Sequence, residues 1–584
     1  MIGSQYMTEL HSVHCEAKKS NACRGTNKHH GVPEKKHENR MKRLVACTRY
    51  VWDKKWDLMI AVAPFLVTSI LCYQHLLGGF GNQIYVGPHG RDWFPGRCRE
   101  LPLRSIQAAL DMAQPGDEIC VLPGVYYERL YVRRSGSISK PIILRAAVPG
   151  KVTISGQLPE AIPSTWKWQN EGGGVYSTSV STPVYRLRDG DVECFRVPWG
   201  GLAGLKSLVS KPNAWSAFCQ EGDRLYLFLK DGIEPRQASL RTHRPAPPPR
   251  EWGGFRSACI WIEADHIRLN GLSVDFGIGS AVHIWKGSDV EVRDCLFSGA
   301  TYGVVCRGRS HVDGVSIVNC LYHNYPQYYW LRDWLTWEAV YASYSSSSLA
   351  ASDATPILIK NCLVAHGGDA LRISPSAEQS VGLAQIEGNT LAFCTDDIVE
   401  FDGDGAGVIF KNNFIYEAHQ NLGFSPVETG PIHVRHNIFL HEPNGVNGSQ
   451  MKLINNRVGE RIQNILVDEN IFVGNWLCWW SNNAQMDQIQ VEANRFLVQR
   501  ITDPPWPTSG VSAKMNQVQV VDSYTSAEHA LVQLLDMSVV PQWVVDSLSS
   551  TAGPTWLRAN EHAATRDIVA YRHRLLHQVN EANE

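Results

Sequence analysis

A short pattern recurs through the middle of the chain and constrains its fold more than any other feature. Runs rich in β-branched residues end in Asn or Asp followed by an apolar residue, as in VSIVNCLYH, ILIKNCLVA and VIFKNNFIY. The marker residues are Asn270, Asp294, Asn319, Asn361, Asn389, Asn413, Asn437, Asn470 and Asn494. Their spacings are 24, 25, 42, 28, 24, 24, 33 and 24 residues. A period in the twenties is typical of stacked coils.

The strand pattern within each repeat decides which kind of coil this is. A leucine-rich repeat has the same period, but its L-x-x-L-x-L frame and its helical half are missing here. Short period-2 runs between polar turns favour coils of three strands, stacked in parallel about 4.8 Å apart. The sequence therefore predicts an all-β fold, a right-handed parallel β-helix, in which stacked Asn side chains satisfy backbone groups at a tight bend.

Three of the fifteen cysteines follow a marker directly, namely Cys295, Cys320 and Cys362. Equal spacing from the marker predicts that they form one inward file. Buried, small apolar side chains are the simplest interpretation, and disulfides or a metal site are the alternatives. The chain contains no C-x-x-C pair, which argues against a zinc ribbon or a thioredoxin-type site.

The segment before the repeats carries a family resemblance. Residues 84–156 contain RSIQAALDMA, the turn Pro115–Asp117 and the strand sequence PGVY. These residues resemble the opening of pectate-lyase-like right-handed β-helix proteins, especially the chondroitinase B and alginate-lyase branch. The resemblance implies a helix that caps the first coil, which would otherwise be an aggregating edge, and a polysaccharide substrate. It extends over about residues 84–500, with residues 160–250 resembling a small β-rich insertion.

The N-terminal region indicates export. Residues 1–56 carry 12 Lys and Arg against 5 Asp and Glu, and no charged residue occurs from Leu58 to Leu77. A basic segment before an apolar run is typical of a signal peptide or a single membrane anchor. The run is of borderline length for a membrane span and contains Pro64, so a buried helix is the alternative. We therefore expect an extracytoplasmic protein, secreted or held at the membrane only through this segment.

These observations divide the chain into segments with different roles. The expected segments are a basic tail (1–56), a signal peptide or anchor (57–79), the N-terminal cap and first coils (80–157), an inserted β-rich module with a Pro-rich linker (158–250), the β-helix repeats (251–500), and a C-terminal cap or tail with short helices (501–584).

Positions at equal distance from their markers should lie above one another in the stack. Asp369, Asp397 and Asn421 each stand eight residues after a marker, and Arg372 and Glu400 each stand eleven after. In this register Asp369 and Asp397 lie about 5 Å apart. Two carboxylates at that distance share a proton, and one acid with one base can cleave a glycosidic bond.

These positions give a set of candidate site residues. We expect Asp369 and Asp397 to be catalytic, with Arg372 and His366 positioning the substrate. The residues expected to contact substrate are Glu400, His419 and Asn421. The alternatives are hydrogen-bonded structural carboxylates and, for Arg372 with Glu400, a surface ion pair.

A carboxylate cluster, TDDIVEFDGDG, contains Asp396, Asp402 and Asp404. Several carboxylates in a short segment can bind Ca²⁺, so Ca²⁺ is a candidate cofactor, although the sequence establishes none. Asp402 and Asp404 lie in a Gly-rich turn, and capping of that turn is the alternative role.

A long excursion after Asn319 is crowded with aromatic residues. We expect Tyr328, Trp330, Trp334 and Trp337 to stack on sugar rings, and a satellite apolar cluster is the alternative. A second group, Trp476, Trp479 and Trp480, is expected at the core or its rim.

Neither catalytic set of the related enzymes transfers cleanly. Thr395–Asp397 resembles the T-D-D element of polygalacturonase-like hydrolases, but HGG at His366–Gly368 and RIS at Arg372–Ser374 precede it instead of following. The Lys base, Arg partner and Ca²⁺-binding carboxylates of the lyase branch have no clear counterpart in the expected order.

The leading hypothesis is a monomeric polysaccharide-active protein that hydrolyses its substrate in a lateral groove. Elimination on uronic-acid polymers and a non-catalytic glycan-binding stack are the alternatives. Asp397→Asn is expected to abolish cleavage and to leave the stack folded. A net charge of −2 and the lack of a phosphate-binding loop argue against nucleic-acid and nucleotide partners.

Overall fold

The computed structural model describes residues 82–157, 166–243, 258–277, 279–307, 312–344, 347–351, 354–373, 384–401, 403, 407–443, 445–446, 448–454, 459–481, 485–507, 509–535, 540–550, 552–555, 557 and 564–583. The basic tail and the apolar segment expected at 1–56 and 57–79 lie outside these residues. Within the described ranges, no helix is both long and apolar enough to span a bilayer. The compact unit Phe80–Glu584 is described by itself below.

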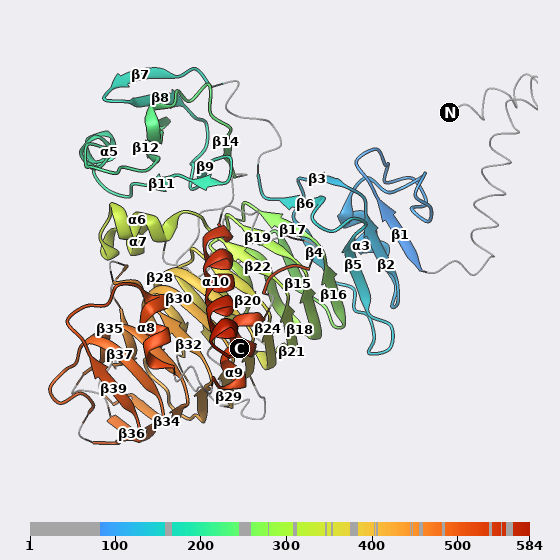
Figure 1. Ribbon diagram of the computed structural model, residues 1–584. Coiled ribbons are helices and arrows are strands. Elements are labelled where there is room, and N and C mark those ends of the chain that lie inside the picture. Colours follow the sequence, from blue (N-terminus) through green and yellow to red (C-terminus); the bar gives the residue numbers. More distant parts are fainter. Residues whose placement is uncertain are drawn as a thin grey trace, which may run out of the picture. The chain divides into compact units, whose positions relative to one another are not determined.

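Parallel strands from successive coils stack into three faces (Figure 1), as the repeat predicts. The first face contains β1 (Gln83–Val86), β2 (Glu118–Val121), β5 (Ile142–Ala146), β16 (Ile267–Asn270), the second half of β18 (Ser280–Arg293), β21 (Val312–Val318), β24 (Ala354–Lys360), β27 (Ala384–Glu387), β29 (Val408–Lys411), β31 (Ile432–Arg435), β34 (Arg461–Asp468), β36 (Gln485–Glu492) and β38 (Val511–Lys514).

The second face contains β3 (Gly124–Tyr126), β6 (Val152–Ser155), β17 (Ser273–Asp275), β19 (Leu296–Ser298), β22 (Leu321–His323), β25 (Leu363–Ala365), β32 (Ile438–Leu440), β37 (Arg495–Arg500), β39 (Gln517–Val520) and the first halves of β28 (Thr390–Glu400), β30 (Phe414–Phe424) and β35 (Ile471–Trp480). The third face contains β4 (Leu130–Val132), the first half of β18, β15 (Ile260–Glu263), β20 (Tyr302–Cys306), β23 (Ser347–Ala351), β26 (Asp369–Ile373), β33 (Ser449–Leu453) and the second halves of β28, β30 and β35. The fold is a right-handed parallel β-helix.

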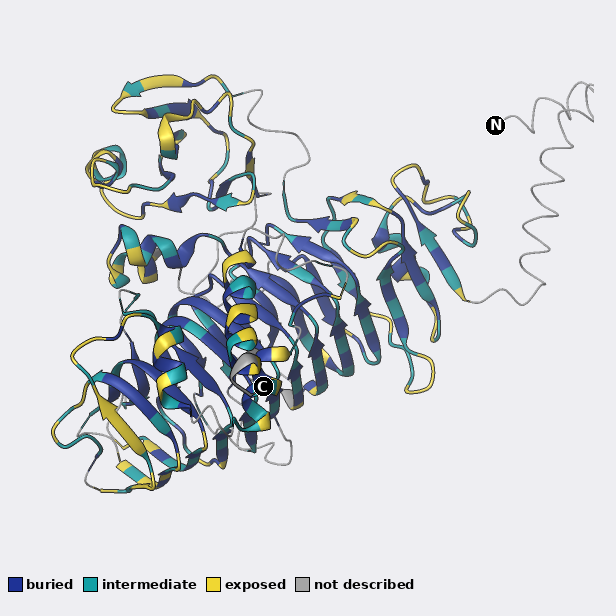
Figure 2. Ribbon diagram, viewed as in Figure 1, coloured by how far each residue is buried: buried dark blue, intermediate teal, exposed yellow. Residues whose placement is uncertain are grey.

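Alternating side chains fill the interior of the coils. Strands of the first face, such as β27, β29 and β31, alternate between half-buried and buried residues (Figure 2), because successive residues of a strand point to opposite sides. The inward positions stack in register from coil to coil. One such file is Ile317, Ile359, Ile386, Phe410, Val434, Val467 and Val491.

The turn from the first to the second face contains the marker residues, but in three files, because Asn270 pairs with Arg293 and so lies one position before Asp294. Asp294, Asn319 and Asn361 adopt a left-handed backbone with φ of 52°, 53° and 51°, which Asn and Asp tolerate better than most residues. The next residue on each coil points inward. That inward file aligns Cys362 with Asn389, so the marker alignment between Asn361 and Asn389 was wrong by one residue.

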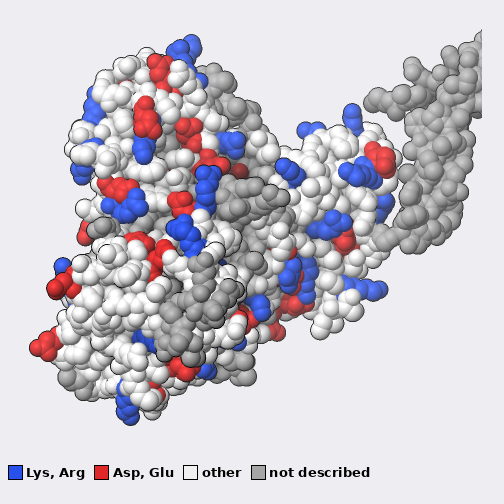
Figure 3. Space-filling view, in the orientation of Figure 1, with Lys and Arg blue, Asp and Glu red and all other residues white. Residues whose placement is uncertain are grey.

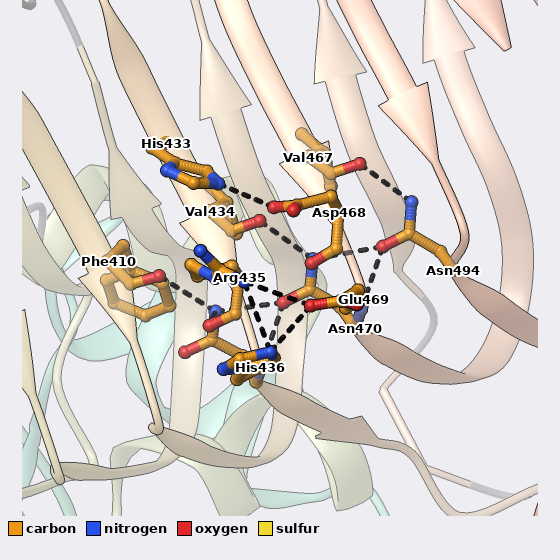
Figure 4. Close-up of polar contacts among 11 residues, drawn as sticks. Phe410, His433, Val434, Arg435, His436, Val467, Asp468, Glu469, Asn470 and Asn494 are labelled. Atoms are coloured by element: carbon orange, nitrogen blue, oxygen red, sulfur yellow. Dashed lines mark hydrogen bonds and ion pairs between the residues drawn. The ribbon is translucent and has the colours of Figure 1, made fainter. Parts of the chain in front are cut away.

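The later coils carry a continuous Asn ladder in the inward file. Each Nδ2 donates to the Oδ1 of the next Asn at 2.9–3.1 Å, and each of these Oδ1 atoms also accepts a backbone N–H. The members are Asn389, Asn413, Asn437, Asn470, Asn494 and Asn516. Figure 4 shows the step from Asn470 to Asn494 beside the Arg435–Glu469 ion pair. The predicted ladder is confirmed for the markers from Asn389 to Asn494, whereas the earlier markers do not belong to it.

The cysteines of the earlier coils occupy the same file. Cys295, Cys320 and Cys362 are buried with free thiols, and the Sγ of Cys320 lies 3.4 Å from the Val318 carbonyl oxygen. Among the described residues, no cluster of His, Cys, Asp or Glu is arranged to hold a metal ion. The inward position predicted for these cysteines is confirmed.

The helix predicted before the first coil is present. α3 (Ile106–Met112) begins after Ser105, whose side chain accepts from the backbone N of Ala108. Its Ile106, Ala109 and Leu110 side chains are buried in the same apolar core as the first coils. This arrangement covers the open end of the stack.

The inserted segment is β-rich, as expected. It contains β7 (Gln169–Gly172), β8 (Val175–Ser179), β9 (Leu187–Asp189), β10 (Val192–Glu193), β11 (Phe195–Arg196), β12 (Ala217–Glu221), β13 (Arg224–Phe228), β14 (Leu240–Thr242), α5 (Gly201–Val209) and the 3₁₀ turn η1 (Lys230–Gly232). The excursion after Asn319 forms α6 (Gln327–Asp333) and α7 (Trp337–Tyr344). Trp330 and Trp334 from this excursion share an apolar cluster with the module.

The C-terminal segment differs from an end cap. Strands continue to Val520, past the boundary expected at residue 500. α8 (Ala527–Leu534), α9 (Gln542–Ser549) and α10 (Arg566–Asn583) then pack against the outer side of the second face (Figure 1). That side is apolar, with Leu363, Phe414 and Ile438 in the shared cluster, so the helices bury a surface that would otherwise be exposed.

The Asn ladder generates a stability prediction. Asn437→Ala removes the acceptor of both the backbone N–H and the Nδ2 of Asn413. Because buried donors are then left unpaired, the free energy of unfolding should fall by roughly 3 kcal/mol. Urea unfolding followed by circular dichroism measures this change. Gln490→Ala, at an exposed position of the first face, is the control, and equal losses in the two variants would contradict the ladder's role.

Candidate functional site

An outward file on the third face joins neighbouring coils through polar side chains. Arg372, Glu400, Gly423, Lys452 and Trp479 are register partners on successive strands β26, β28, β30, β33 and β35. The alternating inward file is apolar, with Leu371, Val399, Leu422, Met451 and Cys478 in the core. The outward file therefore presents polar chemistry on a rigid sheet.

The predicted pair Arg372 and Glu400 is present in this file. Arg372 Nη1 lies 3.0 Å from Glu400 Oε2, and both side chains are partly exposed. Coil stacking thus brings together residues that are 28 positions apart in the sequence, as expected. This contact is the surface ion pair that was the alternative to a functional role for Arg372 and Glu400.

Asp369 and Asp397 lie on adjacent strands, as the register predicts. β26 pairs with β28 at Leu371–Val399 and Arg372–Glu400, and the backbone N of Asp396 donates to the Gly368 oxygen at 3.3 Å. A register shift between Cys394 and Asp397 then pairs Asp397 with Gln420 instead of Asn421.

The role expected for Asn421 is therefore wrong. Its side chain is completely buried, donates to Gln450 Oε1 at 2.6 Å and lies 3.2 Å from His441 Nε2. An amide enclosed in this network cannot contact a substrate on the outer surface.

Asp397 forms an ion pair that the sequence did not reveal, with Lys452, whose side chain is 13% exposed. Its carboxylate is 1% exposed, and Oδ2 accepts from Lys452 Nζ. Gly423 lies between them in the file, and a side chain there would collide with the Asp397 carboxylate. Burial raises the pKa of Asp397, and the Lys452 ammonium opposes that shift.

Lys452 is the residue that sequence reasoning missed. Burial alone would lower its pKa, but Asp397 more than offsets this effect and raises the pKa above its ordinary value. Lys452 is therefore a fixed cation at neutral pH and not a base. A lone Lys in the apolar run MKLI is the signal that could have identified it, because Lys is rarely buried without a partner.

Asp396, next to this pair, is poised to exchange a proton near neutrality. Its side chain is only partly accessible, and burial, followed by the Asp397 charge, raises its pKa to about 7. A carboxyl group with this pKa suits general acid or base chemistry. We expected Asp396 to bind metal. Lys452 already supplies the cation beside Asp397, so this arrangement does not fit a Ca²⁺ site, and Asp402 and Asp404 lie outside the described residues.

The two candidate histidines differ in position. His366 is buried and packs against Phe393 and Tyr325, with ring centroids 5.0 Å away in each case. It belongs to an aromatic cluster beneath α6, so the positioning role expected for it is not supported. His419 stacks on Trp337 at 5.7 Å, and burial, with a smaller effect of Lys452, lowers its pKa to about 4.

Three of the four aromatic residues expected to stack on sugars pack inside the protein. Trp330 and Trp334 are buried against Phe195 of the inserted module, with ring centroids 5.4 and 5.7 Å away. Tyr328 is also buried, and its hydroxyl donates to Glu417. The prediction that these three residues stack on sugar rings is therefore wrong. The alternative, a satellite apolar cluster, is confirmed. Trp337 remains beside His419.

A pocket of about 360 Å³ lies next to the outward file. It is lined by His419, Gln420, Gly448, Ser449, Trp476, Cys478, Trp479 and Thr502. Trp479, the register partner of Lys452, is 51% exposed. The face shown in Figure 3 has acidic and basic side chains interspersed among uncharged ones, so charge is not segregated there.

The buried ion pair predicts a coupled effect of two substitutions. Asp397→Asn leaves the Lys452 charge buried and unpaired, so the free energy of unfolding should fall by roughly 3–5 kcal/mol. The earlier expectation that this substitution leaves the fold intact is therefore revised. Adding Lys452→Met should restore most of the loss. Denaturant unfolding of the single and double variants checks this, and additive losses would contradict the pairing.

Asp396 predicts a pH dependence of stability. Because its pKa is raised from 3.8 to about 7, folding favours its protonated form. The contribution of Asp396 to the free energy of unfolding is fully present below pH 3.8, the pKa of this group in the unfolded chain. It is lost as pH rises through the folded-state pKa of about 7. Relative to the Asp396→Asn variant, the free energy of unfolding of the unsubstituted protein should therefore fall by at most about 1.4 kcal/mol per pH unit across this window. Thermal unfolding between pH 5 and pH 8 measures the difference, and a constant difference would refute the raised pKa.

Comparisons with known proteins agree with this architecture. The Chondroitinase B family model matches residues 103–160. The uncharacterized protein YwoF of Bacillus subtilis (strain 168) is 37% identical over 141 residues, which cover 23% of this chain and 26% of that protein. Pectate lyase PEL9 of Emericella nidulans is 38% identical over 84 residues, which cover 14% of this chain and 20% of the lyase.

Each sequence match thus spans about a quarter or less of the relative's length. A solved structure of XylC with xylose aligns over 75% of this chain and 82% of its own, with a TM-score of 0.45 and 13% identity. The fold is a right-handed parallel β-helix, and its N-terminal coils are similar in sequence to the chondroitinase B family model and to a pectate lyase.

Proposed function

We propose that the protein cleaves glycosidic bonds of a polysaccharide on the outer side of its third face, with Asp396 as the proton-transferring group. The observation that carries the proposal is the cluster of Asp396, Asp397 and Lys452 beside an aromatic pocket. The matching family model describes chondroitinase B, and one relative is named as a pectate lyase, which supports a polysaccharide substrate.

Hydrolysis is the favoured reaction. Protonated Asp396 would donate its proton to the leaving glycosidic oxygen, while Asp369 on the adjacent strand would take a proton from a water that attacks the anomeric carbon. Alternatively, Asp369 would bond to that carbon itself, and water would then hydrolyse the intermediate. Lys452, held by Asp397, would keep positive charge beside the reacting oxygens. Arg372, paired with Glu400 at 3.0 Å, would bind sugar hydroxyls near Asp369. Asp397 then acts by positioning Lys452 and does not itself react.

Elimination on a uronic-acid polymer is the second candidate, because two cations, Lys452 and Arg372, lie in the same file. They could neutralise the uronate carboxylate while ionised Asp396 or neutral His419 removes the adjacent proton. The bond from the neighbouring carbon to the glycosidic oxygen then breaks and leaves an unsaturated sugar. In this reaction the amino acid cations would do the work that Ca²⁺ does in other sites.

A non-catalytic glycan-binding stack is the remaining alternative, in which exposed Trp479 provides adhesion. Export through residues 57–79 fits all three possibilities, and we propose an extracytoplasmic location on that basis.

A polysaccharide panel separates these possibilities. Incubation with neutral and uronic-acid polymers should produce new reducing ends without ultraviolet absorbance if the reaction is hydrolysis. Absorbance from an unsaturated product would establish elimination instead. Binding without either signal would contradict an enzymatic function and favour adhesion.

Asp396→Asn should lower kcat at least 100-fold, because a general acid or base typically contributes that much or more. Asp313→Asn, at an exposed position of the first face, is the matched control and should retain full activity. If Asp396 donates the proton, the rate should fall as pH rises above about 7. A rate that rises up to pH 7 would identify Asp396 as a base, and an active Asp396→Asn variant would exclude it from the chemistry.

A further inference from the structure

The last coil of the stack has two strand edges that no other strand covers. β38 (Val511–Lys514) pairs with β36, and β39 (Gln517–Val520) pairs with β37; within the described ranges, neither pairs with a further strand. All four residues of β39 are exposed (Figure 2). At the other end of the stack, α3 packs on the first coils. The described chain therefore caps one end and leaves the outer edges of β38 and β39, the open end, without strand partners.

The apolar interior is also uncovered at the open end. Val518 and Val520 point inward, because they are the register partners of Phe496 and Val498, which are fully buried. Nevertheless, Val518 is 42% exposed and Val520 is 50% exposed. Trp506 packs against Phe496, with ring centroids 6.0 Å apart, and leaves the two valines exposed. Inward side chains that remain exposed indicate a surface that another molecule covers.

The Asn ladder ends at the same place. Asn516 Oδ1 accepts from Asn494, and Asn516 Nδ2 donates to the Val491 oxygen at 2.7 Å. In the earlier rungs, the backbone N–H of each Asn donates to the Oδ1 of the Asn on the next coil. No further Asn follows Asn516 in the described ladder, so the corner between β38 and β39 presents an N–H donor at the open end.

From these observations we infer that the open end binds a second copy of this chain, end to end, about a two-fold axis through the corner at Met515 and Asn516. β38 runs into this corner and β39 runs out of it, and the two strands are equal in length. A two-fold axis that bisects the corner therefore places each β38 antiparallel to the β39 of the other subunit. One symmetry operation thus pairs both free edges of both subunits.

The side chains of the two strands match in this arrangement, as the self-complementary surface of a two-fold interface requires. Pairing outward from the corner sets inward apolar residues opposite each other, namely Ala513 with Val518 of the partner subunit and Val511 with Val520 of the partner subunit. Like charges do not meet, because β39 carries no charged residue. Free edges usually carry Lys or Pro, which prevent such pairing, and β39 has neither.

The pairing sets the direction of the two candidate sites. An axis that bisects the corner between the first and second faces leaves the molecule through the third face, which lies opposite this corner. The third faces of the two subunits therefore lie on the same side of the dimer. The interface itself does not depend on the proposed function, and the dimer replaces the monomer expected from the sequence.

Sedimentation equilibrium of the full chain tests this inference. The expected mass is twice the 65.2 kDa of the chain. Val518→Lys should abolish the dimer, because it places an unpaired charge in the interface. Val125→Lys is the matched control, because Val125 is 51% exposed on β3, in the first coils, and this variant should remain a dimer. Circular dichroism checks that both variants are folded.

Met515→Cys gives a second measurement, which decides the question if Val518→Lys does not fold. Met515 is 76% exposed and lies beside the proposed axis, so the introduced thiols of two subunits should form a disulfide. Oxidised glutathione accepts the two electrons and two protons and is reduced to two thiols. Trp93→Cys, at a position 74% exposed, should not give a linked dimer.

The inference would be overturned by a single-chain mass at every concentration, or by assembly beyond a dimer. A dimer that persists in folded Val518→Lys, or the failure of Met515→Cys to form a linked dimer, would overturn it equally.

Discussion

Hydrogen bonding between coils is the constraint on which the rest of the structure depends. Each coil leaves backbone groups at its corner that must be paired, and the Asn ladder from Asn389 to Asn516 pairs them through side chains of the next coil. Because the ladder fixes the register, it also fixes which outward residues become neighbours. Arg372 meets Glu400, and Lys452 meets Trp479, through the same stacking.

Much of the fold was predictable because the physical signal is periodic. The ladder and the inward cysteines follow from local sequence and spacing, and the family resemblance of residues 84–156 implied the capping helix. Details that depend on one residue were not predictable. The alignment of Asn361 with Asn389 was wrong because Gly388, with φ of 68°, takes the corner position there and Asn389 takes the inward one. The irregular pairing after Cys394 similarly moved Asn421 out of the expected file.

The candidate site was predicted in part, and the residues that were predicted wrongly or missed have a common cause. Coil register brought Asp369, Asp397, Arg372 and Glu400 to one face, as spacing implied. Spacing gives no information on burial by other segments, so it could not show that the inserted module covers Trp330 and Trp334. Nor could it show that Gly423 leaves room for the bond between Asp397 and Lys452. That bond makes Asp397 the partner of a cation, whereas burial, followed by the Asp397 charge, raises the pKa of Asp396 to about 7.

In the proposed function a carbohydrate chain lies across the third face, over Asp396 and beside the aromatic pocket. A crystal structure of the Asp396→Asn variant with an oligosaccharide of the cleaved polymer tests it most directly. We expect a glycosidic oxygen within hydrogen-bond distance of the side chain at position 396. An oligosaccharide bound to another face, or Asp397 and Lys452 separated from each other, would contradict it.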